Sequence, residues 1–146
     1  MLQDRRTLEP VLVSDPAGIL YLYIRTDLNR IYRSVSIDNG FTWTRPEPLN
    51  VPSPDSMSDV HRLTDGRYLV AWNNHPDSRD YLAVGVFSDS RLDTLQQYQL
   101  VPRQGETGAN YPRLIIQEGE VLTAFSWIRR DNANHRFGDI WIARYI

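Results

Sequence analysis

The side chains that could do chemistry are few in type and are spread along the chain. The three histidines, His61, His75 and His135, stand far apart and show none of the spacings typical of metal ligands. Cysteine is absent, so the chain can form neither a disulfide nor a thiolate metal site. No glycine-rich segment has the pattern of a phosphate-binding loop. We therefore expect no metal site and no cofactor.

Three aspartates, Asp55, Asp59 and Asp65, follow a cluster of prolines in a stretch rich in turn-forming residues. Carboxylates in such stretches usually cap turns. Asp59 and His61 are nevertheless candidates for the lining of a cleft between repeat units.

One eight-residue segment carries a complete sequence motif. Residues 36–43 match the Asp-box pattern Ser-x-Asp-x-Gly-x-Thr-Trp at Ser36, Asp38, Gly40, Thr42 and Trp43. The pattern suits a β-hairpin, because the aspartate can accept backbone N–H bonds across the turn and glycine can adopt a positive φ. The tryptophan can then pack on the sheet. Five defined positions in eight residues make this a specific signal.

The elements that must position these residues form a repeat. Each of three segments has a turn that ends in glycine, an apolar strand, a short polar turn and a second apolar strand, and a further apolar stretch precedes each glycine. The glycines Gly18, Gly66 and Gly119 are 48 and 53 residues apart, close to the ~40–50 residues of one propeller blade. The predicted strands cover residues 11–13, 18–25 and 30–37, then 60–63, 66–73 and 81–87, then 114–116, 119–127 and 139–145.

These strands are rich in β-branched and aromatic residues, and no window keeps a helical period for long. The sequence therefore predicts an all-β fold with three blades in a single domain over residues 1–146. The repeat units run over about residues 8–50, 51–104 and 105–146, and prolines at positions 46, 48, 52 and 54 separate the first from the second.

The third unit stops at Ile146, directly after its third strand, whereas a propeller blade normally has four strands. Three blades cannot close a ring, and open sheet edges at both ends would promote aggregation. We therefore expect the chain either to pair with a second copy or to be a piece of something larger.

Beyond the Asp box, the sequence resembles the sialidase (neuraminidase) superfamily of BNR/Asp-box propellers over nearly its whole length. Glu9-Pro10, followed 16 residues later by Arg25, resembles the glutamate and the second arginine of that family. Residues 73–82 resemble the loop that carries the third arginine, and residues 110–114 resemble the segment of the catalytic tyrosine. The resemblance implies about three four-stranded blades, which is the C-terminal half of a six-bladed propeller.

Two further segments extend the resemblance. Residues 88–90, Ser-Asp-Ser, form a degenerate copy of the Asp box one unit later, and residues 125–130 resemble the closing blade. In this family the Asp box is a structural fastener away from the active site.

The resemblance implies roles for four residues. Arg25 and Arg79 would be two of the three arginines that bind the carboxylate of a sialic acid through charge-assisted hydrogen bonds. Tyr111 would be the nucleophile, and Glu9 would be the base that takes its proton. Further candidates for the cleft are Asp59, His61, Asn74 and Trp127.

Each of these four residues also has a simpler interpretation. Glu9 could be a solvated charge, and Arg25 or Arg79 could pair with aspartates that are nearby in the sequence. Tyr111 could be an aromatic side chain at a strand edge that packs on its neighbour.

The family's first arginine and its aspartate acid/base come from the N-terminal half of the propeller and have no counterpart in this chain. A general acid contributes a factor of ~10²–10⁴, so we expect the chain alone to be a very poor sialidase. Three hypotheses remain. The chain is half of a sialidase-like glycoside hydrolase, or two copies form a six-bladed ring that binds acidic sugars rather than cleaving them, or it is a structural or interaction propeller with decayed catalytic positions.

The composition is typical of an ordinary soluble globular protein. A net charge of −2 argues against a nucleic-acid partner, and no apolar run approaches the ~18 residues of a membrane span. No secretory signal is visible at the N-terminus. The expected partners are an acidic sugar or glycoconjugate and either a second copy or an N-terminal half, and the compartment stays unknown.

Overall fold

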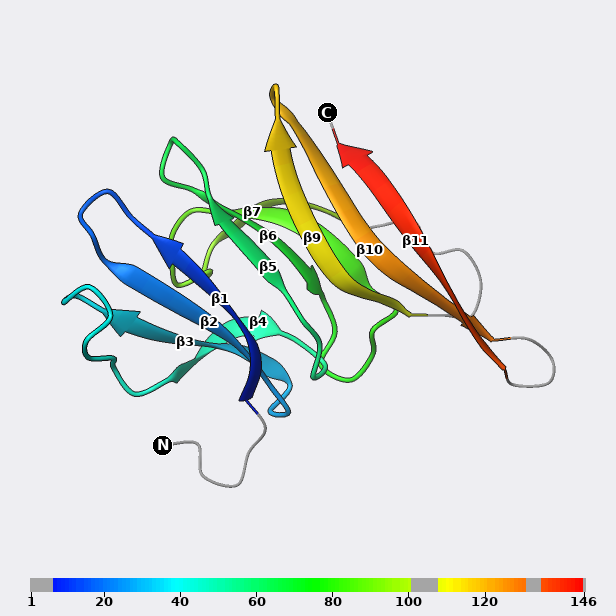
Figure 1. The fold of residues 1–146 in the computed structure, drawn as a ribbon, viewed down its shortest axis with the longest axis horizontal. Coiled ribbons are helices and arrows are strands. Elements are labelled where there is room, and N and C mark those ends of the chain that lie inside the picture. Colours follow the sequence, from blue (N-terminus) through cyan, green and yellow to red (C-terminus); the bar gives the residue numbers. More distant parts are fainter. Residues whose placement is uncertain (1–6, 101–107, 131–134, 146) are drawn as a thin grey trace.

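The computed structural model describes residues 7–100, 108–130 and 135–145, and these residues form three antiparallel β-sheets that lie side by side (Figure 1). The predicted all-β fold is confirmed. The predicted boundary between the second and third units, at residues 104 and 105, lies outside the described residues.

The first two sheets have four strands each, and the third has three among the described residues. The first sheet consists of β1 (Thr7–Ser14), β2 (Leu20–Thr26), β3 (Arg30–Ser36) and β4 (Glu47–Pro52) in that order. The second consists of β5 (Asp59–Arg62), β6 (Tyr68–Asn73), β7 (Leu82–Phe87) and β8 (Leu95–Leu100), and the third of β9 (Ala109–Gln117), β10 (Glu120–Arg130) and β11 (Arg136–Tyr145) in the order β11-β10-β9.

Strand β4 covers part of the proline-rich stretch that we expected only to separate two units. Pro48 pairs with Tyr32 and Pro52 pairs with Arg30, with a register shift between them. Proline is compatible with β4 because this strand lies at the edge of its sheet, where a missing N–H removes no bond from a further strand.

Strand β6 shows how the sheets pack on one another. All six of its residues are buried, and alternate residues belong to different cores. Val70 and Trp72 face the first sheet, whereas Leu69 and Ala71 pack against Leu114 of the third sheet. A strand that is covered on both faces is apolar throughout, which explains its continuous hydrophobic run. The first strands of the three sheets, β1, β5 and β9, are neighbours.

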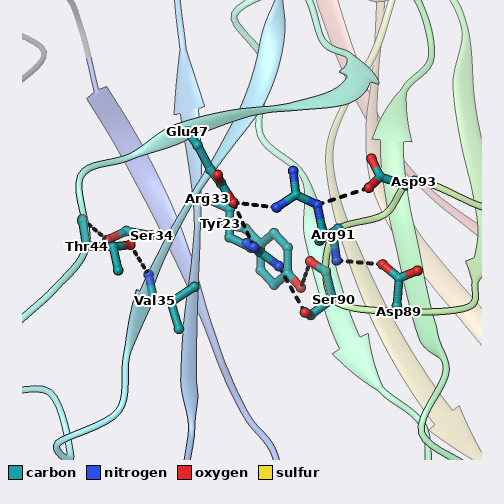
Figure 2. A network of polar contacts seen from close by, with 10 residues as sticks. All are labelled: Tyr23, Arg33, Ser34, Val35, Thr44, Glu47, Asp89, Ser90, Arg91 and Asp93. Carbon is teal, nitrogen blue, oxygen red and sulfur yellow. Dashed lines mark hydrogen bonds and ion pairs between the residues drawn. The ribbon is translucent and has the colours of Figure 1, made fainter.

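A polar network, which we call the clasp, joins the first and second sheets and consists of Tyr23, Arg33, Glu47, Ser90 and Arg91 (Figure 2). The Arg33 guanidinium donates to Ser90 Oγ at 2.9 Å and pairs with Glu47 at 2.7 Å. Arg91 reaches the same Glu47 carboxylate oxygen at 3.1 Å. The Tyr23 hydroxyl donates to the Ser90 carbonyl at 2.8 Å, and burial raises the pKa of Tyr23. The clasp therefore ties the degenerate Asp-box turn of the second sheet to strands β2, β3 and β4.

The outward faces of the first and third sheets carry apolar patches, and the face of the third sheet also carries the Arg144–Glu120 ion pair. On β11, Ile140 is 76% exposed and Ile142 is 69% exposed, while their strand neighbour Ala143 packs against the core on the opposite face. The outward face of the first sheet carries a hollow of about 510 Å³, lined mainly by apolar side chains that include Leu8, Leu22 and Ile24. The described residues contain no helix long and apolar enough to cross a membrane.

Candidate functional site

Residues from strands of the first and third sheets and from two loops meet in one polar network. We call it the site cluster, and it consists of Glu9, Arg25, Asp55, Arg79 and Tyr111. Four of these residues were predicted to belong together from the sequence, and Asp55 was not.

Arg25 is the centre of the site cluster. Its side chain is only 8% exposed, and its guanidinium pairs with Glu9 Oε2 at 2.5 Å and with Asp55 Oδ1 at 3.0 Å. The Tyr111 side chain lies close enough to Arg25 to contribute to the pKa of its guanidinium. Burial alone would lower the pKa of Arg25, but the interactions with Glu9, Asp55 and Tyr111 outweigh this effect and raise it. Arg25 is therefore a permanent cation with two anionic partners.

Arg79 lies in the loop between β6 and β7 and joins the site cluster through neutral acceptors. Its guanidinium donates to the Asp55 backbone carbonyl at 2.5 Å and to Asn110 Oδ1 at 3.4 Å. The loop is held from behind by Asn73, which is fully buried and donates to the carbonyls of Arg79 and Ala109 at 2.8 and 2.9 Å. Arg79 is thus fixed between the second and third sheets.

Three members of the site cluster have an unusual backbone. Glu9, Asp55 and Tyr111 have φ values of 42°, 39° and 55°, in the left-handed region that L-residues rarely adopt. Glu9 and Tyr111 each precede a proline, and each lies at a register shift in the first strand of its sheet. Such bulges redirect side chains, and strained backbone tends to cluster at functional sites at a cost of ~1–3 kcal/mol per residue.

Asp59 and His61, which were considered for the cleft, lie on β5 and form a second polar network that is separate from the site cluster. Asp59 is buried, and its carboxylate accepts the Leu114 N–H at 2.8 Å and lies 3.3 Å from His61 Nε2 and 3.5 Å from the Arg113 guanidinium. Burial favours the neutral acid, but the bonds with His61 and Leu114 and the charge of Arg113 hold the pKa of Asp59 below its usual range. This network ties β5 to β9.

The other two candidates for the cleft have mainly structural contacts. The Asn74 backbone N–H donates to the Tyr81 carbonyl at 2.7 Å, and the neighbouring Asn73 makes the bonds that hold the Arg79 loop. Trp127 is 3% exposed and packs in the core against Phe125 and Trp141. The structure therefore places Trp127 in the core and not in the site cluster.

The Asp box forms the hairpin turn between β3 and β4 and is nearly self-contained. Asp38 accepts the Thr42 N–H at 2.8 Å, the Thr42 hydroxyl at 2.5 Å and the Ser36 hydroxyl at 2.8 Å. These bonds lower the pKa of Asp38 to about 2. Gly40 has a φ of 89°, and its carbonyl accepts the Trp43 indole N–H at 3.0 Å. Ser36 pairs with Leu20, which puts the turn at the opposite end of β2 from Arg25.

Sequence reasoning missed three residues that hold the site cluster together, namely Asp55, Asn73 and Asn110. Asp55 follows a proline in a stretch of turn-forming residues, where capping is the ordinary expectation. Asn73 ends an apolar strand, and Asn110 precedes Tyr111 directly. Their contacts cross from one sheet to the next, so no local pattern could have revealed them.

The site cluster combines two guanidinium groups, two carboxylates and an exposed tyrosine in one place. The formal charges of Glu9 and Asp55 cancel those of Arg25 and Arg79. Such a set can bind a polar ligand that has its own carboxylate and can hold a proton acceptor near a hydroxyl. Within the part of the chain that the structure describes, no group of three or more His, Asp or Glu side chains could hold a metal ion.

Comparisons with known proteins agree with this architecture. Residues 1–123 match the family model of the BNR repeat-like domain. Because this match covers most of the sequence, the chain belongs to the BNR repeat-like family. No curated protein matches the sequence.

Solved structures with a similar fold include two trans-sialidases and a further glycoside hydrolase. The leech intramolecular trans-sialidase, in complex with 2,7-anhydro-Neu5Ac, has a TM-score of 0.71 and 21% identity over 94% of this chain and 23% of its own. The intramolecular trans-sialidase from Ruminococcus gnavus has a TM-score of 0.72 and 19% identity over 97% of this chain and 32% of its own. The α-L-arabinanase from Penicillium chrysogenum has a TM-score of 0.57 and 18% identity over 94% of this chain and 46% of its own.

These likenesses show the fold alone, because all three identities are low. The chain spans less than half of the length of each of these proteins.

Proposed function

We propose that this member of the BNR repeat-like family is a sialidase-like glycosidase module that acts on or binds sialic acid or a related acidic sugar. The observation that carries the proposal is the meeting of Glu9, Arg25, Arg79 and Tyr111 in one network, although these residues lie far apart in the sequence. Chance would rarely bring four residues selected by their resemblance to a catalytic set into a single cluster.

In this proposal each residue of the site cluster has a chemical task. A sialic acid has a carboxylate on its anomeric carbon, and Arg25 and Arg79 would bind that carboxylate. The Tyr111 oxygen would attack the anomeric carbon while the bond to the leaving group breaks. Glu9 would take the tyrosine proton, because a phenol is a weak nucleophile until a base removes that proton.

Protonation of the leaving group needs an acid that this chain does not supply at the positions matched to the family. The loss of a general acid typically costs ~10²–10⁴ in rate. We therefore expect the 146 residues to bind an acidic sugar and to cleave it very slowly, and we expect full activity only when the rest of the site is present.

Apolar patches on the outward faces of the first and third sheets support a larger assembly. Ile140 and Ile142 on one face, and Leu8 and Leu22 on the other, would be covered if further sheets packed on them. The three sheets would then be blades of a six-bladed propeller, completed either by a second copy or by an N-terminal half. Light scattering on a sizing column distinguishes these cases, because a homodimer has twice the 17.0 kDa mass of the chain.

The binding proposal is tested by titrating N-acetylneuraminic acid into the chain with NMR or calorimetric detection. We expect a Kd in the millimolar range, and we expect Arg79→Ala to abolish binding. Arg67→Ala is the matched control, because Arg67 is an exposed arginine of the β5–β6 turn whose carboxylate partner is Asp65. A wild-type chain that does not bind, or an Arg79→Ala variant that binds equally well, would contradict the proposal.

Tyr111→Phe adds a second arm to this test. The variant keeps the ring and loses only the hydroxyl, so we expect it to fold and to bind the sugar. Any glycosidase activity of the chain or of its completed assembly should disappear. Unchanged turnover would refute the role of Tyr111 as nucleophile.

A further inference from the structure

The linker from β4 to β5 is buried almost throughout, which is unusual for a connection between two sheets. Ser53, Ser56, Met57 and Ser58 are all buried, and the Asp55 side chain is 25% exposed. The linker is anchored at its start, because the Ser53 N–H donates to the Asn29 carbonyl at 3.1 Å. Asp55 is therefore presented to the site cluster from a segment that has little freedom to move.

Asp55 accepts one hydrogen bond from each of two arginines, and it uses a different atom for each. Its carboxylate accepts from Nε of Arg25, on the first sheet, at 3.0 Å. Its backbone carbonyl accepts from Nη2 of Arg79, in the β6–β7 loop of the second sheet, at 2.5 Å. One residue thus sets the separation of two guanidinium groups that come from different sheets.

Glu9 is the other carboxylate on Arg25, and its position is much less constrained. It is 37% exposed and lies on β1, at the edge of the first sheet. A ligand carboxylate that approaches Arg25 can replace Glu9 without disturbing the fold. It cannot replace Asp55 as readily, because the backbone on both sides of Asp55 is buried.

We propose that Asp55 is a positioning residue that holds Arg25 and Arg79 in the relative arrangement needed to bind the carboxylate of an acidic sugar. This inference rests on the proposed function and deepens it. The left-handed backbone of Asp55, with a φ of 39°, is what allows its side chain and its carbonyl to face the two arginines. Holding both donors in place before the ligand arrives reduces the entropy that binding costs.

Asp55→Asn is the variant that tests the proposal. Asparagine has nearly the same shape and tolerates a left-handed backbone, so the fold and the carbonyl bond to Arg79 should persist. The charge-assisted bond to Arg25 is weakened. We expect the affinity for N-acetylneuraminic acid to fall about fivefold, because a hydrogen bond to a charged acceptor is roughly twice as strong as one to a neutral acceptor.

A second measurement needs no ligand. The NMR signal of the Arg25 Nε–H group should move in Asp55→Asn, because its hydrogen-bond acceptor is weakened. The Arg79 signal should stay in place. The unfolding midpoint in urea should change little, which separates positioning from a general structural role.

Asp65→Asn is the matched control. Asp65 accepts from Nε of Arg67 at 2.8 Å in an exposed turn, so it has the same carboxylate-to-arginine geometry outside the site cluster. This variant should change the Arg67 signal and leave sugar affinity unaltered.

The outcomes separate the two proposals. If the wild-type chain does not bind the sugar at any concentration, the proposed function fails, and the role of Asp55 in ligand binding fails with it. If the wild type binds and Asp55→Asn binds with equal affinity, or if the Arg25 signal is the same in both, the positioning role is overturned and the proposed function stands.

Discussion

Two arginine networks hold the first sheet to the second, and their chemistry is nearly the same. The site cluster is built around Arg25 and the clasp around Arg33, and both side chains are 8% exposed. Each arginine pairs with a partly exposed glutamate, Glu9 or Glu47, and each network reaches a loop of the second sheet. Burial and charge alone therefore do not distinguish a candidate functional site from a structural joint.

The backbone distinguishes them. Three of the five residues in the site cluster have a positive φ, whereas Tyr23, Arg33, Glu47, Ser90 and Arg91 in the clasp have none. The five clasp residues join two sheets without a left-handed backbone of their own, although the turn that carries Ser90 and Arg91 has one at the next residue, Leu92, with a φ of 54°. Left-handed backbone at the contacting residues themselves is therefore not needed for joining sheets, and this difference favours a functional explanation for it in the site cluster.

The largest expected change is a loss of stability when the clasp is disrupted. Arg33→Ala should lower the free energy of unfolding by about 2 kcal/mol, because the buried guanidinium's bonds to Glu47 and Ser90 are lost. The loss is limited because water can still solvate the partly exposed Glu47 carboxylate. Urea denaturation measures this change.

Arg91→Ala is the control for this prediction. Arg91 contacts the same Glu47 oxygen but is 52% exposed, so its removal should change the free energy of unfolding much less than Arg33→Ala does. Equal losses of stability in both variants would contradict the prediction, because burial of Arg33 would then add nothing to the strength of the clasp.

A smaller effect should reveal the strain at the site cluster. Tyr111→Gly and Tyr111→Ala both remove the exposed ring, but only glycine adopts a φ of 55° freely. We expect the glycine variant to be the more stable of the two by about 0.5–1 kcal/mol, because the left-handed penalty for alanine exceeds the entropy cost of glycine. Thermal or urea unfolding of the two variants measures the difference.

Tyr81 provides the opposite case. It is also an exposed tyrosine, and it does not have a positive φ. There, alanine should be the more stable replacement by about 0.5–1 kcal/mol. The same order of stability at both positions would show that Tyr111 is unstrained.

The sequence predicted a strand wherever the residue pattern of that strand alone was sufficient to identify it. Strand β6 is covered on both faces, so its continuous apolar run was visible without any structure. Strand β4 was missed because Pro48 and Pro52 indicate a break, and proline is compatible with a strand only at a sheet edge. The position of an edge depends on the sheet as a whole, which local patterns do not encode.

The candidate site was predictable only in part, for a related reason. Glu9, Arg25, Arg79 and Tyr111 were found through their resemblance to a family pattern. Asp55 joins two of them through contacts between sheets, and nothing in its local sequence sets it apart from a turn cap.

Trp127 shows the converse problem. It was considered for the cleft, yet it shares a face of β10 with Phe125, and that face is covered by the second sheet. Strand alternation places the two rings on one side, but it does not say which side another sheet will cover.

The Asp box is a third polar network, and it differs from the site cluster and the clasp because it stabilises its turn without an arginine. Bonds from Thr42 and Ser36 lower the pKa of Asp38 to about 2, against about 3.9 for an unfolded aspartate. The charged form is thus favoured in the folded state. This contribution to stability is present above pH 4 and is lost as the pH falls through 2.

Asp38→Asn should therefore show a shallower loss of stability between pH 4 and pH 2 than the wild type, in urea midpoints measured at each pH. Arg33→Ala should keep the wild-type slope in that window, since its deletion leaves the Asp38 bonds intact. If Asp38→Asn keeps the full slope, the acid sensitivity arises elsewhere, and Asp59, whose pKa is also lowered, becomes the residue to replace next.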